Sequence, residues 1–342
     1  YNYDPINQTI QWGIKFNYNE KNITKENAFL EDFLPAGHDL VNDSLKVYKV
    51  TFDSSGKETS EPVDSSEYTL TDNTEEDSHS FTLQFKSDIT FAIKIEYETT
   101  ASEPIIDSGS VINKVVYNEE EKSATSPIQQ GVLAKGYTNE NYKDKTVEWK
   151  IDVNKNKYKM DGLVLKDKFV SGGLELFESS FTITTADKEV LARDTDYKLE
   201  VQDEGFTITF TETIEEHLII TYKTKFDPSY SIFSNNARIS WGEFSKEVTA
   251  NFKPDDYTIQ NGYKNGSYNP ITKEITWEIG INYNLKSISK AIIEDYILQG
   301  QKLVDGSIEV FHAEPLGGKN EFSKGAKLSE DQFTVDTIEN GE

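Results

Sequence analysis

Residues 146–172, TVEWKIDVNKNKYKMDGLVLKDKFVSG, decide the fold, because variants of this stretch occur twice more in the chain. The first copy is residues 9–37, TIQWGIKFNYNEKNITKENAFLEDFLPAG, and the third is residues 275–300, ITWEIGINYNLKSISKAIIEDYILQG. Each copy has a Trp among alternating apolar residues, then a polar gap, then an apolar run that leads to a charged residue and an Asp. The marker tryptophans Trp12, Trp149 and Trp277 stand 137 and 128 residues apart. This period indicates tandem domains, because solenoid repeats are roughly 20 to 50 residues long.

The repeat divides the 342 residues into three expected domains, residues 1–125, 126–252 and 253–342. Only the middle domain contains every expected strand. The first is expected to lack its opening strand and the third its last three strands, so we expect the chain to be a fragment of a longer protein. Two polar segments lie where one copy ends and the next begins: residues 119–130, EEEKSATSPIQQ, and residues 247–256. We expect both to be linkers.

The periodic segments alternate apolar and polar residues and are rich in Val, Ile, Thr, Tyr and Phe, as half-buried strands are. The first two copies share their order of segments, since SFTLQF matches GFTITF and FAIKIEYETT matches HLIITYKTKF. Short strands with almost no helical stretch predict an all-β fold of tandem immunoglobulin-like antiparallel β-sandwiches, end to end. The expected strands are residues 9–18, 44–52, 68–71, 80–85, 91–98 and 111–117, then 147–153, 162–169, 181–184, 197–201, 206–210, 217–223 and 235–241. The tryptophans are expected to be core residues.

Composition excludes several classes of function. The net charge of −25, from 60 acidic and 35 basic residues, argues against a nucleic-acid partner, because phosphates are bound by Lys and Arg. The chain has no cysteine, so neither disulfides nor thiolate chemistry are expected, and a bacterial source is favoured. No apolar run is long enough to cross a membrane, and the first residues do not resemble a signal peptide.

Enzymatic motifs are also missing from the sequence. The four histidines, His38, His79, His217 and His312, lack metal-ligand spacing, and there is no phosphate-binding loop or nucleophile elbow. A pair of cooperating carboxylates among the acidic residues is left open, but we expect no enzyme and no cofactor. The acidic run 72–77, DNTEED, is interpreted as a hairpin tip rather than a calcium site, because it lacks the ligand spacing and the glycine of a calcium loop.

In order along the chain, the segments resemble the collagen-binding-type domains of cell-wall-anchored adhesins from Gram-positive bacteria. The matching pieces are KNGSYNPITKEITWEIGIN (264–282), FLEDFLPAG (29–37), NDSLKVYKV (42–50), ITYKTKF (220–226) and SNNARISWG (234–242). The resemblance covers the second copy completely, the first except its opening strand, and the third up to the end of the sequence. No single piece is specific, but their order in three copies is.

The resemblance implies a variant immunoglobulin sandwich with a spontaneous isopeptide cross-link between a Lys and an Asn, assisted by an acid. In the second copy the matching residues are Lys135, Asn235 and the assisting Asp167; the partial sets are Asp32 with Asn113, and Lys264 with Asp295. Strand parity selects Asn235 over Asn236, because Asn235 shares a face with the apolar residues that follow it. The missing lysine would precede Tyr1 and the missing asparagine would follow Glu342.

These residue types suit that chemistry. A lysine buried among apolar side chains loses its charge and becomes a nucleophile, while a buried carboxylic acid keeps its proton and can polarise the Asn carbonyl as ammonia leaves. The reaction would occur once per domain, as maturation rather than turnover. Taken alone, each of the three aspartates precedes a turn and is an ordinary turn former.

For function, the resemblance implies a cell-wall-anchored, extracellular adhesin region of a Gram-positive bacterium that binds a host matrix protein such as collagen. Attachment to peptidoglycan would use a region outside this sequence, and neither membrane insertion nor nucleic-acid binding is expected. The alternative is a mechanical stalk that projects a separate adhesive head. An exposed aromatic trench would favour adhesion, and uniformly polar outer faces would favour the stalk. The tyrosines near the domain junctions are either packing or contact residues, with packing favoured; they are Tyr137, Tyr142, Tyr263 and Tyr268.

Overall fold

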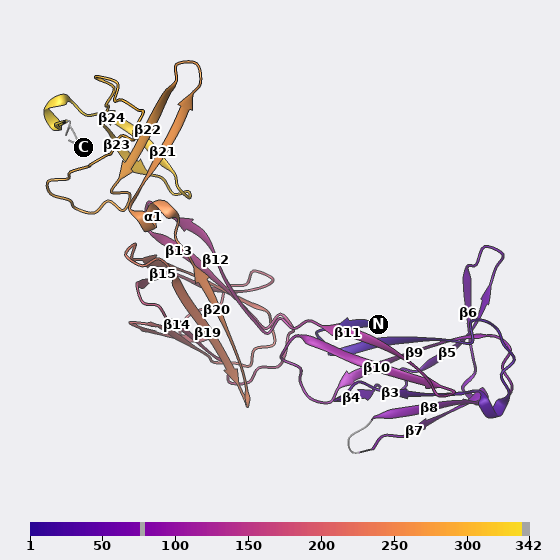
Figure 1. Ribbon diagram of the computed structural model, residues 1–342. Helices are drawn as coiled ribbons and strands as arrows, with labels where there is room; N and C mark the ends of the chain where they lie inside the picture. The colour runs from indigo at the N-terminus through magenta and orange to yellow at the C-terminus, as the bar shows by residue number, and fades with distance from the viewer. Residues whose placement is uncertain (76–78, 337–342) are drawn as a thin grey trace. The chain divides into compact units, whose positions relative to one another are not determined.

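The computed structural model describes residues 1–75 and 79–336 (Figure 1). It divides into two compact units: residues 1–132 with 154–158, and residues 133–153 with 159–342. Regular structure is almost entirely antiparallel β-strand, which confirms the all-β prediction; the helical elements are α1 (Asp256–Gln260), η1 (Lys25–Asn27), η2 (Ser65–Glu67) and η3 (Glu330–Gln332). Among the described residues, no helix is long and apolar enough to span a membrane.

The first unit contains two sheets. One has the strand order β1-β2-β9-β5-β6, with β4 also paired to β9, and the other has the order β11-β10-β3-β8-β7. Their bounds are β1 (Asn2–Asp4), β2 (Thr9–Phe16), β3 (Phe29–Phe33), β4 (His38–Leu40), β5 (Lys46–Phe52), β6 (Glu58–Pro62), β7 (Tyr68–Asp72), β8 (Ser80–Phe85), β9 (Ala92–Ala101), β10 (Gly109–Tyr117) and β11 (Glu120–Ile128).

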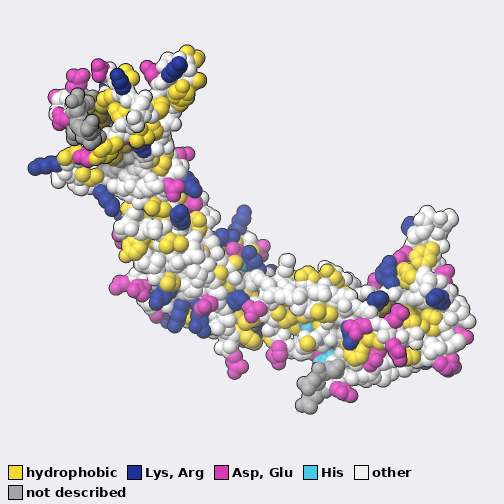
Figure 2. All heavy atoms as spheres, viewed as in Figure 1, with side chains coloured by type: hydrophobic (Ala, Val, Ile, Leu, Met, Phe, Trp, Pro, Cys, Tyr) yellow, Lys and Arg dark blue, Asp and Glu magenta, His cyan; other side chains and the backbone are white. Residues whose placement is uncertain are grey.

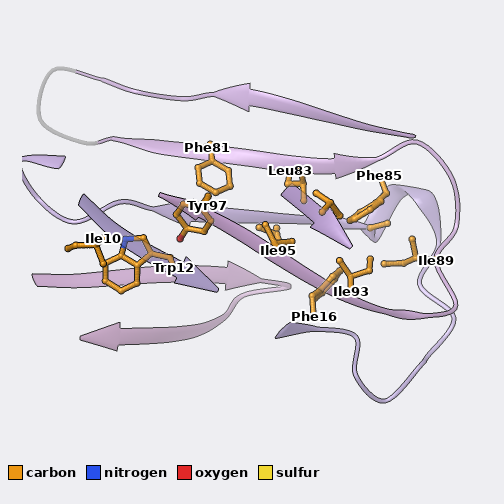
Figure 3. Packing of buried hydrophobic residues seen from close by; sticks show 13 residues of the cluster. Ile10, Trp12, Phe16, Phe81, Leu83, Phe85, Ile89, Ile93, Ile95 and Tyr97 are labelled. Carbon is orange, nitrogen blue, oxygen red and sulfur yellow. The ribbon is translucent and has the colours of Figure 1, made fainter. Parts of the chain in front are cut away.

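Alternation along these strands builds the core of the first unit. Trp12 on β2 and Tyr97 on β9 are buried from one sheet, and Phe81 and Leu83 on β8 are buried from the other. In Figure 3 the Tyr97 ring lies between Phe81 and Trp12. Because apolar residues of both sheets fill one cluster, the two sheets form the predicted sandwich.

The second unit repeats this arrangement with the sheet orders β12-β13-β18-β15 and β16-β17-β14-β19-β20. It also contains the two-stranded sheets β21-β22 and β23-β24. The bounds are β12 (Leu133–Asn141), β13 (Thr146–Val153), β14 (Val164–Phe169), β15 (Leu174–Thr185), β16 (Tyr197–Gln202), β17 (Gly205–Phe210), β18 (Leu218–Phe226), β19 (Phe233–Trp241), β20 (Phe244–Phe252), β21 (Gly262–Asn269), β22 (Glu274–Ile281), β23 (Phe311–Pro315) and β24 (Phe322–Lys327). Trp149 is fully buried between the two larger sheets, as expected.

The two expected linkers are wrong, because most of each is an edge strand. β11 pairs with β10 through a turn at Asn118 and Glu119, whose positive φ angles are typical of a tight hairpin. β20 pairs with β19 in the same way, after a turn at Gly242. Edge strands expose most of their side chains, so their composition is as polar as that of a linker.

Three further details differ from the sequence-based expectations. The short strand β1 pairs with β2, so residues 2–4 already belong to an opening strand. In the third copy, the segments SIEVF (307–311) and DQFTV (331–335) are expected to match strands of the other copies, but residues 307–310 and 331–335 form no strand. Trp277 is half exposed on the two-stranded sheet β21-β22. The acidic run lies between the paired strands β7 and β8, but residues 76–78 lie outside the described residues. The domain boundaries remain predictions.

Candidate cross-linking site

Strand register brings the predicted residues of the second copy to one place in the sandwich. On one sheet, Asp167 of β14 pairs with Ala237 of β19, so Asn235 lies two residues along the same inward face. On the other sheet, Lys135 of β12 pairs with Ile151 of β13, and Tyr222 of β18 pairs with Trp149. The strict alternation of β14, β18 and β19 therefore aims an acid, a phenol and a carboxamide into the core.

The four side chains meet around one hydroxyl group. The Lys135 and Asp167 side chains are both 0% exposed, and the Lys135 Nζ donates a hydrogen bond to Oδ2 of Asp167. The same Nζ lies 2.9 Å from the Tyr222 hydroxyl, and the Asn235 Nδ2 donates to that hydroxyl, also at 2.9 Å. The structure therefore brings together the predicted amine, acid and carboxamide, and adds a tyrosine to them.

Burial sets the protonation of this site. It lowers the pKa of Lys135 to about 8, against the opposing attraction of Asp167. It also raises the pKa of Asp167, although Lys135 opposes this shift. Both changes favour a neutral amine beside a protonated carboxylic acid, because a charged group loses hydration in a buried site. A neutral amine is the form that can attack a carbonyl carbon.

Two oxygen atoms of the site have no hydrogen-bond partner: Oδ1 of Asp167 and Oδ1 of Asn235. Buried polar atoms are almost always hydrogen-bonded, so two such atoms in one site call for a chemical explanation. A proton on the Asp167 carboxyl group would provide a donor, and the Asn235 carbonyl oxygen is an acceptor. The arrangement thus suits an acid that polarises the carboxamide.

The first unit contains the same frame, that is, a buried acid, a carboxamide and a phenol at equivalent strand positions. The Asn113 Nδ2 donates to Oδ2 of Asp32 at 3.0 Å and to the Tyr97 hydroxyl at 2.8 Å. All three residues are buried, and burial raises the pKa of Asp32 to about 7. Oδ1 of Asp32 and Oδ1 of Asn113 again lack a hydrogen-bond partner. By register, the position opposite Ile14, which corresponds to Lys135, precedes Tyr1.

In the third copy, Lys264 and Asp295 come together in a different environment. Their Nζ and Oδ1 atoms are 2.5 Å apart, and the Nζ lies 4.8 Å from the centre of the Trp277 ring. However, the two side chains are 41% and 37% exposed. The predicted pair therefore forms, but water reaches both groups, unlike Lys135 and Asp167 in the second copy.

Sequence reasoning missed Tyr222 and Tyr97, although both copies contain the signal. Each tyrosine belongs to a Tyr-x-Thr segment that the sequence analysis used only to identify a strand. The Thr of each segment accepts a hydrogen bond from the indole of the marker Trp, with both distances at 2.9 Å: Trp12 to Thr99, and Trp149 to Thr224. The inward parity that these tyrosines share with the threonines could have identified them as site residues.

The junction tyrosines mostly pack, as favoured. Tyr142 is buried, Tyr137 contacts the Trp149 ring edge-on, and Tyr263 stacks on Tyr257 with ring centres 4.2 Å apart. Tyr268 differs, because it is exposed. Within residues 1–75 and 79–336, no group of three His, Cys, Asp or Glu side chains is arranged to hold a metal ion.

Comparison with protein families gives one match. The model of the collagen-binding domain matches residues 2–126, 129–250 and 259–341, which together are most of the chain. A comparison with curated proteins found no match.

Several solved structures are similar in parts. The collagen-binding subdomain of the Enterococcus faecalis surface protein ACE is 18% identical over 36% of this chain and 98% of that chain, with a TM-score of 0.30. The collagen adhesin CNA from S. aureus is 14% identical over 79% of this chain and 89% of that chain, with a TM-score of 0.30. The collagen-binding domain of the Erysipelothrix rhusiopathiae surface protein RspB is 13% identical over 72% of this chain and 88% of that chain, with a TM-score of 0.30. Scores this low add nothing to the family match.

Proposed function

The chain belongs to the collagen-binding domain family, and from this premise we propose that it is an adhesin region that binds a collagen-type ligand of the host matrix. The observation that carries the proposal is the family match in three consecutive segments. The proposed location is the extracellular surface of a Gram-positive bacterium, with attachment to the cell wall through a region outside this sequence. A triple helix offers a narrow and regular surface for such a region to bind.

A second candidate function is a stalk that spaces a separate adhesive head from the cell. The observation that favours it is the polar outer face of β13 and β18, where Glu148, Lys150, Asp152 and Lys223 point away from the core. Figure 2 shows Asp and Glu side chains in many separate places on the visible surface. Charged, patch-free faces suit a spacer, because they avoid non-specific association.

Binding to immobilised triple-helical collagen separates the two candidates. The adhesin proposal predicts saturable binding of the whole chain, and weaker binding to the same collagen after heat denaturation. An Asp167→Ala variant, measured in parallel, tests whether binding depends on the buried site. If the whole chain fails to bind native collagen even at high concentration, the adhesin proposal for this region is overturned and the stalk remains.

We further propose that the second copy closes an isopeptide bond between Lys135 and Asn235. The neutral Nζ of Lys135 attacks Cγ of Asn235, and the electron pair of the carbonyl moves to Oδ1, which the Asp167 proton stabilises. The bond from Cγ to Nδ2 then breaks, and Nδ2 leaves as ammonia with a proton that came from Nζ. Asp167 is protonated again at the end of the reaction. The buried contacts of Lys135 with Asp167 and Tyr222 support this chemistry.

Such a bond would join β12 of one sheet to β19 of the other. By analogy with a disulfide, closing a loop of about 100 residues restricts the unfolded chain by roughly 4 to 5 kcal/mol. A covalent clamp near both ends of the domain would also bear pulling force that would otherwise separate hydrogen-bonded strands. This property serves an adhesin and a stalk equally, so it does not separate them.

Intact mass tests the cross-link directly. The wild-type chain should be lighter than its sequence by one ammonia, and a tryptic digest should contain the Lys135 peptide joined to the Asn235 peptide. Asp167→Ala should restore the full mass. Asp32→Ala is the matched control, because it removes the equivalent acid from the first unit and should keep the loss of one ammonia. A wild-type chain of full mass would overturn the cross-link.

A further inference from the structure

One group at the cross-linking site has no assigned role: the hydroxyl of Tyr222. It contacts both nitrogen atoms whose bonds change, since Nζ of Lys135 and Nδ2 of Asn235 each lie 2.9 Å away. Asp167 holds Nζ through Oδ2, and its Oδ1 has no partner. The phenol therefore contacts both the attacking and the leaving nitrogen, and it is also hydrogen-bonded to Asp167, which interacts with Asn235 as well.

The first unit repeats this placement. Tyr97 pairs with Trp12 as Tyr222 pairs with Trp149, and its hydroxyl accepts a hydrogen bond from Nδ2 of Asn113 at 2.8 Å. In both units an aromatic ring at the equivalent position of the facing sheet meets the tyrosine edge-on, Phe81 in one and Phe206 in the other. The phenol thus keeps its position relative to the carboxamide in two copies of different sequence.

Packing alone does not explain a tyrosine here. The Tyr222 ring contacts the rings of Phe181 and Phe206, and a phenylalanine at position 222 would keep both contacts. A buried hydroxyl is costly unless it has partners, and the partners of this one, Lys135, Asn235 and Asp167, all belong to the reacting set. The hydroxyl is therefore the part of the side chain that needs a chemical reason.

We propose that Tyr222 is a catalytic residue of the cross-linking reaction, whose hydroxyl accepts a proton from Nζ of Lys135 and donates its own proton to Nδ2 of Asn235. The inference rests on the proposed Lys135 to Asn235 bond. As Nζ bonds to Cγ it loses one proton to the phenol oxygen, and the phenol proton moves to the departing Nδ2, which leaves as ammonia. The tyrosine ends the step neutral, and no other reactant is needed.

The protonation of Tyr222 suits a relay in which both transfers are coupled. Burial raises the pKa of Tyr222 well above its usual value, and the nearby Asp167 raises it further. The phenolate is therefore unfavourable, so the hydroxyl must give up one proton as it receives another. Positioned proton transfer of this kind typically contributes about 100-fold to 10,000-fold to a rate.

The test follows the reaction in the whole chain after a short pulse of synthesis. Samples are quenched over time, and intact mass gives the fraction that has lost one ammonia. Tyr222→Phe should slow this loss by at least about tenfold relative to wild type, as expected for the loss of an acid–base group. Tyr197→Phe is the matched control, because Tyr197 is a buried tyrosine of the same sandwich whose ring contacts Phe181 and Phe210, and the rate should not change.

The outcomes are distinguishable. If the wild type loses ammonia and Tyr222→Phe loses it equally fast, the relay is overturned and the cross-link stands. If the wild type loses none, the cross-link itself fails and the relay with it. A ring-fluorinated tyrosine at position 222 keeps the hydrogen bonds but has a more acidic hydroxyl. It should change the rate and its pH profile, whereas a purely positioning hydroxyl would leave both unchanged. If Tyr222→Phe does not fold, the comparison of the fluorinated chain with wild type still tests the relay.

Discussion

The Asp32 site of the first unit and the Asp167 site of the second are built on equivalent strands, and the position that corresponds to Lys135 precedes Tyr1 in the first. Each has a buried acid, a carboxamide two residues along the neighbouring strand, and a phenol from the facing sheet. In the first site the carboxamide donates both to Oδ2 of Asp32 and to the Tyr97 hydroxyl. In the second, the Lys135 amine donates to Oδ2 of Asp167, and the carboxamide donates to the phenol.

The comparison shows which part of the proposed reaction each site contains. In the first unit, Oδ1 of Asp32 and Oδ1 of Asn113 lack a hydrogen-bond partner, and the position that corresponds to Lys135 precedes Tyr1. With Lys135, the same acid oxygen holds a nucleophile beside the carboxamide. The proposed chemistry therefore depends on what the opening strand contributes at the position opposite Ile151, where the second copy has Lys135.

The largest expected effect comes from removing the lysine of the second site. Lys135→Met removes the nucleophile and keeps an apolar chain of similar length. Because the proposed cross-link would be lost, the free energy of unfolding of this sandwich should fall by roughly 4 to 5 kcal/mol. Denaturant unfolding monitored by tryptophan fluorescence measures this change.

Lys166→Met is the control for this experiment, because Lys166 lies on β14 with its side chain exposed. It should leave the unfolding midpoint nearly unchanged. If Lys135→Met and wild type unfold at the same denaturant concentration, the second site holds no stabilising covalent bond.

A somewhat smaller effect is expected from pH in the first unit. The pKa of Asp32 is about 7 when folded, against an ordinary value of 3.8, so the folded state holds this proton more tightly. Its contribution to stability is full below about pH 4 and is lost as the pH rises to 7, with a size on the order of 4 kcal/mol. The melting temperature of the first unit, measured by calorimetry, should fall over this range.

Asp32→Asn should remove that part of the pH dependence, since an amide does not titrate. Asp43→Asn is the control, because Asp43 is an exposed turn residue whose left-handed conformation Asn also adopts. A pH dependence that persists in Asp32→Asn would show that another group causes it.

The smallest effect tests the hydrogen bond between the marker Trp and a Thr, which both units contain. Thr99→Val and Thr224→Val each remove the acceptor of a buried indole N–H, which should cost about 1 to 3 kcal/mol in each unit. Thermal unfolding of both variants should show similar losses, with Thr221→Val, on the outward face of β18, as the control. A loss of stability in only one unit would show that this hydrogen bond does not contribute equally to the two sandwiches.

Much of this architecture could be predicted from the sequence. Alternation predicted most strands of the first two copies to within a few residues, and parity placed Asn235 and Asn113 on the inward faces. The linkers at residues 119–130 and 247–256 were predicted wrongly, because an exposed edge strand has the composition of a linker. Tyr222 escaped notice because an aromatic residue on a core face usually needs no reason beyond packing.

The sequence by itself determined the repeated order of strands and the face on which each side chain lies, because both follow from local periodicity. Only the tertiary structure decided that Lys135, Asp167, Tyr222 and Asn235 meet around one hydroxyl. These residues come from four strands of two sheets, and pairing between distant strands depends on the whole sandwich. Their protonation depends on the same packing, since burial is a property of neighbours that are far away in the chain.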